Sequence, residues 1–198
     1  MLKMQAEADL VETMRDLIRD ATLGLAVSER VIPTLDSISG KTGLSPAQIE
    51  ACYPSLDAIA VELRKVAGDL FSDIDEAMPS GNNLSEVLNE VVALRAKFYE
   101  AAADFKHLAD AGERFLPSVA TANAICDARY RGRLAEALEP FCGGNTESLV
   151  AQVELLTSWQ SWRHLRGVQR LSVDQAIALT RSLLTAVASG VDQPIWAD

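Results

Sequence analysis

Apolar residues recur every three or four positions along most of this chain, and the two-residue alternation typical of β-strands is almost absent. A period of three to four residues places apolar side chains on one face of an α-helix. The chain is therefore predicted to be all-α, with an N-terminal three-helix unit, a C-terminal helical bundle and about nine helices in total. The predicted helices cover residues 10–25, 34–39, 45–53, 55–78, 83–105, 119–138, 145–166 and 172–189, with a short helix or two turns at 106–117.

The start and end signals are clearest around the second and third predicted helices. Gly43 provides the turn between them, because glycine enters the left-handed backbone region without steric cost. Ser45 precedes the third helix and Gln48 follows three residues later, which is the spacing of a capping box. Pro46 takes the first helical position, where its missing N–H costs nothing. Two short helices joined in this way form the pattern of a helix-turn-helix.

These residues resemble the N-terminal motif of TetR-type transcriptional regulators. The matching segments are Thr34, Ile38-Ser39, Thr42-Gly43-Leu44-Ser45, Ile49 and Tyr53-Pro54-Ser55. Near the other end of the chain, the tryptophan-containing segment 156–163, followed by Leu171-Ser172, is similar to the eighth and ninth helices of that family. The resemblance therefore covers nearly the whole chain.

The resemblance implies a helix-turn-helix DNA-binding domain over residues 1–54 and a ligand-binding and dimerisation domain over residues 55–198. It also implies a repressor that binds double-stranded operator DNA as a homodimer and is released by a small ligand. The amide of Gln48 is suited to pair with adenine, and the same amide also serves the capping box. The residues expected to contact DNA phosphates are Thr34 and Lys41, and those expected in the groove are Ser45, Ala47 and Gln48.

The charge of this segment differs from that of a typical DNA-binding motif. The whole chain has a formal net charge of −10. Between residues 27 and 60, two cations face four anions. Where family members usually carry a phosphate-binding tyrosine, a histidine and a lysine, this chain has Glu50, Cys52 and Leu56. Because phosphate contacts dominate affinity for DNA, an alternative hypothesis is a TetR-like fold that has lost DNA binding and acts as a ligand sensor or protein-interaction module. A third hypothesis is a helical dimer that binds no ligand.

Few charged residues fall on the apolar faces of the C-terminal bundle, so a hydrophobic or neutral ligand is expected in an internal pocket. The side chains expected to line it are Phe71, Phe98, Phe105, Asn123, Cys126, Tyr130 and Trp159. The last two helices are apolar around much of their circumference, which is typical of helices covered on both sides. A twofold dimer contact is expected through Leu149, Val153, Leu156, Trp162, Ile177 and Leu184. A solvated face is expected to hold Arg129, Arg131 and Arg133.

The sequence gives no sign of several other classes of function. The two histidines, His107 and His164, lack metal-binding spacing relative to cysteines or carboxylates, so neither a metal nor another cofactor is expected. No nucleophile elbow, phosphate-binding loop or Cys–His pair occurs, so the chain is not expected to be an enzyme. No apolar run is long enough to span a membrane. Three cysteines without paired spacing are typical of a reduced, cytoplasmic protein.

Overall fold

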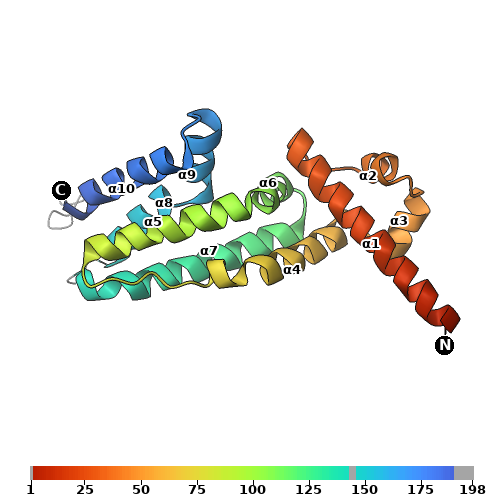
Figure 1. Ribbon diagram of the computed structural model, residues 1–198, viewed down its shortest axis with the longest axis horizontal. Coiled ribbons are helices and arrows are strands. Elements are labelled where there is room, and N and C mark those ends of the chain that lie inside the picture. The colour runs from red at the N-terminus through yellow and green to blue at the C-terminus, as the bar shows by residue number, and fades with distance from the viewer. Residues whose placement is uncertain (1, 143–145, 190–198) are drawn as a thin grey trace. The chain divides into compact units, whose positions relative to one another are not determined.

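A computed structural model describes residues 2–142 and 146–189 of the chain (Figure 1). The prediction of an all-α chain with about nine helices is confirmed, because most of the described residues are helical and none of them forms a strand. In chain order the helices are α1 (Leu2–Glu29), α2 (Leu35–Thr42), α3 (Pro46–Cys52), α4 (Leu56–Asp75), α5 (Leu84–Ala101), α6 (Ala103–Gly112), α7 (Pro117–Leu138), the 3₁₀ turn η1 (Glu139–Phe141), α8 (Thr146–Leu156), α9 (Trp159–Arg163), the π-helical turn η2 (His164–Val168) and α10 (Val173–Ser189).

The chain packs as two compact units, each built from two segments of sequence. The first unit combines the chain up to Leu70 with Ala102–Ile125. The second combines Phe71–Ala101 with the chain from Cys126 onward. The sequence predicts a boundary between residues 54 and 55, which divides the chain by function into a DNA-binding part and a ligand-binding part. This functional boundary stays a prediction.

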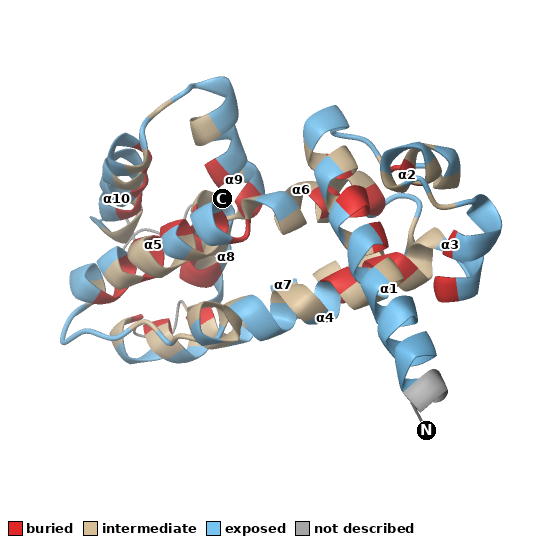
Figure 2. Ribbon diagram, turned by 45° about the vertical axis from the view of Figure 1, so that its right-hand side comes forward, coloured by how far each residue is buried: buried red, intermediate tan, exposed pale blue. Residues whose placement is uncertain are grey.

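In the first unit, α1 packs against α2, α3 and α6. Figure 2 shows buried residues in red on each of these four helices. Full burial of one valine, leucine or isoleucine side chain stabilises a fold by about 1.5–3 kcal/mol relative to leaving it exposed. The cluster that holds α2 and α3 in place consists of Ile18, Ala26, Ile38, Ile49, Cys52, Tyr53, Ile59, Leu63 and Leu108.

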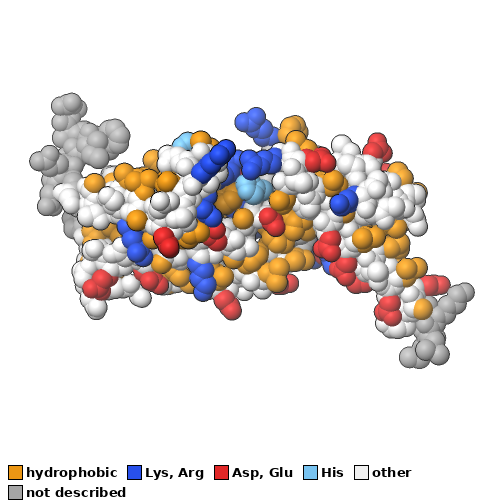
Figure 3. Space-filling model, turned by 45° about the horizontal axis from the view of Figure 1, so that its top comes forward, with side chains coloured by type: hydrophobic (Ala, Val, Ile, Leu, Met, Phe, Trp, Pro, Cys, Tyr) orange, Lys and Arg blue, Asp and Glu red, His pale blue; other side chains and the backbone are white. Residues whose placement is uncertain are grey.

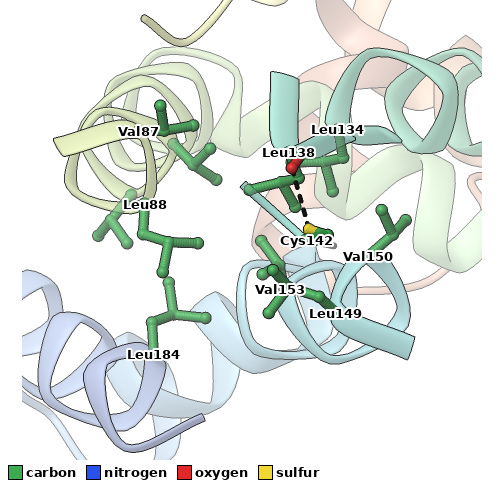
Figure 4. Close-up of a cluster of buried hydrophobic side chains, with 11 residues drawn as sticks. Val87, Leu88, Leu134, Leu138, Cys142, Leu149, Val150, Val153 and Leu184 are labelled. Carbon is green, nitrogen blue, oxygen red and sulfur yellow. Dashed lines mark hydrogen bonds between the residues drawn. The ribbon is translucent and has the colours of Figure 1, made fainter. Parts of the chain in front are cut away.

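In the second unit, α10 packs against α5 and α8, and α5 also contacts α9. Figure 4 shows Val87 and Leu88 of α5 and Leu184 of α10 on one side of the cluster. Leu134 and Leu138 of α7 and the side chains of α8 point toward them from the other side. The thiol of Cys142 donates to the carbonyl of Leu138 at 2.9 Å, so this buried sulfur has a hydrogen-bond partner. The full cluster is Val87, Leu88, Val91, Val92, Leu134, Leu138, Cys142, Leu149, Val150, Val153 and Leu184.

The predicted helix caps are confirmed. The Ser45 hydroxyl accepts from the backbone N–H of Gln48, and Pro46 lies in the first helical position. Gly43 has φ 75° and ends α2 in the left-handed conformation, which glycine adopts without the Cβ penalty. Equivalent capping bonds run from the backbone N–H of Ala58 to Ser55, of Glu86 to Asn83, and of Gln175 to Ser172.

The continuous helix predicted over residues 145–166 is wrong, because the chain is interrupted between α8 and α9. Ser158 has an extended backbone, with φ −69° and ψ 159°, and its hydroxyl accepts from the N–H of Ser161 to cap α9. Serine side chains compete in this way with the helical hydrogen bonds of the backbone. The predicted helix start at Asn145 lies outside the described residues.

Two other predicted helices end earlier than expected. The helix predicted to reach Met78 stops at Asp75, since Pro79 disfavours a helical conformation in the residue before it. The helix predicted over residues 83–105 breaks at Ala102, whose backbone has φ −101° and ψ 13°. No glycine, proline or capping side chain marks this second break in the sequence. Ala102 is buried, so we attribute the break to tertiary packing.

Candidate functional site

The first candidate surface is the pair of helices α2 and α3. Ile38 and Ile49 anchor the two helices in the core, and Gly43 sets the turn between them. The five residues that the sequence predicts to contact DNA are all exposed: Thr34, Lys41, Ser45, Ala47 and Gln48. The structure thus brings the predicted residues onto two adjacent capped helices, and their contact with DNA stays a prediction.

Gln48 is held by the cap that it completes. Its side-chain oxygen accepts from the Ser45 backbone N–H at 2.9 Å and from the Ser45 hydroxyl at 3.0 Å. An amide has one carbonyl oxygen and one NH₂ group. With the oxygen engaged in the cap, the NH₂ group is the part of Gln48 left to bind a partner.

The acidic residues of this segment do not all present a free carboxylate to a partner bound at α2 and α3. Asp57 accepts from the backbone N–H of Ser118 at 3.1 Å and from the Ser118 hydroxyl at 2.7 Å, so it caps the first turn of α7 within the same unit. Leu56 is partly buried against the core cluster of this unit. Glu50, in contrast, is exposed on α3. Glu50 is therefore the departure from the family pattern that presents an anion on this surface.

The predicted ligand-binding side chains fall into both compact units. Phe105 and Asn123 belong to the first unit, where Phe105 packs against the core cluster. Cys126 belongs to the second unit and is partly exposed.

Four of the seven predicted ligand-binding side chains lie in one aromatic group of the second unit: Phe71, Phe98, Tyr130 and Trp159. The rings of Phe71 and Phe98 meet edge to face at 6.4 Å between centroids. Tyr99 links this pair to Trp159, because its ring lies 5.6 Å from Phe98 and 5.5 Å from Trp159. Tyr130 joins the group through an arginine, Arg95.

Arg95 of α5 lies at the centre of this aromatic group. Its guanidinium carbon is 3.9 Å from the centre of the Tyr130 ring, 4.4 Å from Tyr99 and 5.3 Å from Phe98. These distances are within the range of cation–π attraction. Its side chain is only 15% exposed, and its Nε is buried without a hydrogen-bond partner. Burial lowers the pKa of Arg95, but Tyr99, Tyr130 and Asp75 outweigh burial and leave this pKa raised. Arg95 therefore remains a cation.

The two tyrosines are fixed by hydrogen bonds to one residue, Thr157. Arg95 donates to the Tyr99 hydroxyl, which in turn donates to the Thr157 carbonyl at 3.0 Å. The Thr157 hydroxyl gives its single proton to the Val153 carbonyl at 2.6 Å. The Tyr130 hydroxyl, 2.7 Å away, must therefore donate to Thr157. Burial raises the pKa of both phenols, so they stay protonated donors at neutral pH.

A small cavity lies beside Arg95. It offers about 20 Å³ of space for a water-sized group. Its charged lining residues are Asp75, Arg95 and Arg133. Tyr130 and the side chains of Ile74, Ala77, Pro79, Val91, Leu94, Phe98 and Leu134 form the rest of the wall. Two cations and one anion thus line this cavity, whereas the sequence predicts a hydrophobic or neutral ligand, and that ligand stays a prediction.

Arg95, Arg133 and Asp75 were not predicted as site residues, although the sequence contains a signal for two of them. Arg95 continues the apolar stripe of α5, four residues after Val91 and four before Tyr99, so its side chain falls on the buried face. Arg133 lies three residues after Tyr130 on α7, so the two side chains share a helix face. Its side chain is 17% exposed, whereas that of Arg131 is 63% exposed. The expectation of a solvated face is therefore wrong for Arg133.

The residues predicted for a dimer contact are mostly interior. Leu149, Val153, Trp162 and Leu184 are buried within the chain, so little of their surface remains for a partner. Leu156 and Ile177 are partly exposed. The exposed large apolar side chains of α8, η2 and α10 are Leu155, Val168, Leu179 and Leu183. Figure 3 shows hydrophobic side chains gathered over α10 on the face in view. The dimer stays a prediction, with these four as its candidate contacts.

Two further properties concern the described residues as a whole. In residues 2–142 and 146–189, no group of three or more His, Cys, Asp and Glu side chains is arranged to hold a metal ion. In the same part of the chain, no helix combines the length and the apolar character needed to cross a membrane.

Comparison with known proteins gives one match, at the level of structure. No protein-family model matches the chain, and no curated protein sequence matches it. The fold is similar to the crystal structure of a proposed transcriptional regulator from Pseudomonas aeruginosa PAO1, with a TM-score of 0.62 and 15% sequence identity. The match covers 90% of this chain and 92% of the other. At this identity, it establishes that the two proteins share a fold.

Proposed function

We propose that this protein is a TetR-like transcriptional regulator that binds operator DNA as a homodimer through α2 and α3. A small ligand, bound in the second unit, releases the DNA and so relieves repression. The shared fold with a proposed regulator supports this function. The family resemblance of both ends of the sequence supports it independently.

The observation that carries the proposal is the geometry of α2 and α3. Each helix starts with a capping box and is anchored by a buried isoleucine, and a left-handed Gly43 joins the two. All five predicted contact residues are exposed on these helices or at their starts. In helix-turn-helix proteins, the second of the two helices enters the major groove and its N-terminal residues meet base edges. Ser45, Ala47 and Gln48 occupy that part of α3.

The capping role of Gln48 restricts which base it can recognise. Pairing with adenine needs both the oxygen and the NH₂ group of the amide. The oxygen is already engaged by Ser45, so the free NH₂ group favours a base that presents acceptors. In the major groove guanine offers two acceptors, N7 and O6, whereas thymine O4 and adenine N7 are single acceptors. We therefore expect Gln48 to favour guanine while the cap is intact.

The test is selection of bound duplexes from a random DNA pool by the full chain. We expect a sequence with twofold symmetry to be enriched, since a symmetric dimer binds two half-sites. Gln48→Ala is expected to relax the preference at one position of each half-site. Gln175→Ala is the matched control, because Gln175 completes an equivalent capping box at Ser172 of α10. Failure to enrich any sequence at low salt would contradict the proposal.

A second candidate function is a TetR-fold ligand sensor without DNA binding. The exposed Glu50 on α3 favours it, since an anion at this position repels phosphates. Glu50→Gln separates the two functions. If the parent chain selects no sequence and Glu50→Gln does, then Glu50 has abolished DNA binding. If the parent chain already binds a selected site tightly, the second candidate is excluded.

A further inference from the structure

Arg95 is a largely buried cation, and one of its donors, Nε, is unsatisfied. Burying a charge costs several kcal/mol unless it is paired and hydrogen-bonded. Its guanidinium stacks on three aromatic rings and donates to Tyr99. Its Nε nevertheless has no hydrogen-bond partner. A buried guanidinium with a free donor is a good receptor for a planar anion, because its N–H groups form a rigid fork.

The anion nearest to Arg95 is Asp75, and it is held loosely. One carboxylate oxygen of Asp75 lies 3.9 Å from Arg95 and 3.7 Å from Arg133. Charge-assisted hydrogen bonds between nitrogen and oxygen are usually about 2.7–2.9 Å long. Asp75 thus balances part of the charge of the two arginines without forming a close bidentate pair with either.

We infer that the cavity beside Arg95 binds the carboxylate group of a small monocarboxylic acid with an apolar body, and that this group displaces Asp75 from Arg95 and Arg133. The inference rests on the proposed ligand-responsive function and names the chemical class of its ligand. With Asp75 in place, two arginines and one aspartate leave a single positive charge among the lining residues, which attracts a monoanion. Once Asp75 is displaced, the ligand carboxylate is the anion that faces the two arginines. The wall of Ile74, Val91, Leu94 and Phe98 fits an aliphatic or aromatic body.

The displacement of Asp75 also supplies the room that the ligand needs. The cavity holds about 20 Å³, enough for about one water molecule. Asp75 is the last residue of α4, and the chain from Glu76 to Asn83 is not helical. Movement of this connection enlarges the cavity without breaking a helix. The exchange of Asp75 for a ligand therefore acts on the end of α4, the helix that follows α3 in the sequence.

The test measures binding to the full chain by calorimetry, with benzoate and octanoate as probes and benzamide and octanamide as neutral counterparts. We expect the acids to bind at least about tenfold more tightly than the amides, because a hydrogen bond to a charged group accounts for such a factor. Asp75→Asn is expected to strengthen binding of the acids about tenfold, since it removes the internal competitor. Arg133→Gln is expected to weaken it by a similar factor.

Arg131→Gln is the matched control, because Arg131 lies on the same helix but is exposed and bonded to Glu154. It should leave binding of the acids unchanged. Equal affinity for acids and amides, no binding of any probe at about 10 mM, or unchanged or weaker binding of the acids by Asp75→Asn would overturn the inference. Tight binding of inorganic phosphate without binding of benzoate or octanoate would overturn it as well.

DNA binding is measured separately on the same preparations. DNA binding without a preference for acids overturns the ligand class alone. Preference for acids without DNA binding overturns the proposed regulator alone.

Discussion

The two compact units use polar side chains in opposite ways. On α2 and α3, polar groups are exposed and bond to residues three positions away, as Thr34 does with Ser37 and Ser45 with Gln48. In the second unit, the side chain of Arg95 is only 15% exposed and Tyr99 is buried. Tyr99 bonds to Thr157, which is 58 positions away. The first arrangement leaves side chains available to an external partner. The second leaves the Nε donor of Arg95 without a partner inside the unit, which is the basis of the proposed ligand site.

The largest expected effect comes from equal truncations in the two cores. Ile49→Ala in the first unit and Leu149→Ala in the second each remove a fully buried aliphatic side chain. Each is expected to lower the free energy of unfolding by about 2–5 kcal/mol, as measured by urea denaturation. Leu70→Ala, at a side chain that is 63% exposed, is the control and should change stability by about 0.5 kcal/mol or less. A small effect of Ile49→Ala alone would show that α2 and α3 are not anchored as described.

The turn between α2 and α3 is tested by two glycine substitutions of opposite expected sign. Gly43→Ala is expected to cost about 1–2 kcal/mol, because φ at this position is 75° and alanine is strained there. Gly40→Ala is expected to stabilise by about 0.5–1 kcal/mol, since Gly40 lies inside α2. A Cβ at either position meets no atom within 4 Å, so backbone conformation alone separates the pair. Thermal unfolding of both variants measures the difference, and effects of the same sign would contradict the left-handed turn.

The smallest expected effect is the pH-dependent stabilisation of the second unit by the ion pair of Glu100 and Arg166. Arg166 donates to the carboxylate of Glu100 through two nitrogens, and the indole N–H of Trp162 donates to it as well. These hydrogen bonds lower the pKa of Glu100. A lowered pKa stabilises the folded state above the ordinary glutamate value of about 4.3, and that contribution is lost as the pH falls through the folded value.

Glu100→Gln should therefore lower the melting temperature at pH 7, and this effect should shrink as the pH falls below the ordinary glutamate value of about 4.3. The cost at pH 7 is expected to stay below about 1 kcal/mol, because the pair is partly exposed. Glu147→Gln, at an exposed residue of α8, serves as the control. A Glu100→Gln effect that is independent of pH would show that the ion pair is not its cause.

The contrast between the units also explains what the sequence could predict. The caps and the Gly43 turn depend on residues within a few positions of one another, so their spacing was sufficient. The break at Ser158 was missed, although Ser158 and Ser161 form a capping pair. The break at Ala102 has no local signal. The partners of Arg95 come from α4, α5 and α7, and no spacing in the sequence brings these helices together.

The central claim, that α2 and α3 bind DNA, is tested most directly by the salt dependence of binding to a selected duplex. Fluorescence anisotropy between about 50 and 200 mM salt gives the slope of log K against log salt concentration, which counts phosphate contacts. We expect a negative slope for the parent chain, reduced by about one unit in Lys41→Gln. The slope should be unchanged in Lys97→Gln, which alters an exposed lysine of the second unit. No binding at the lowest salt concentration, or equal slopes for Lys41→Gln and the parent chain, would contradict the account.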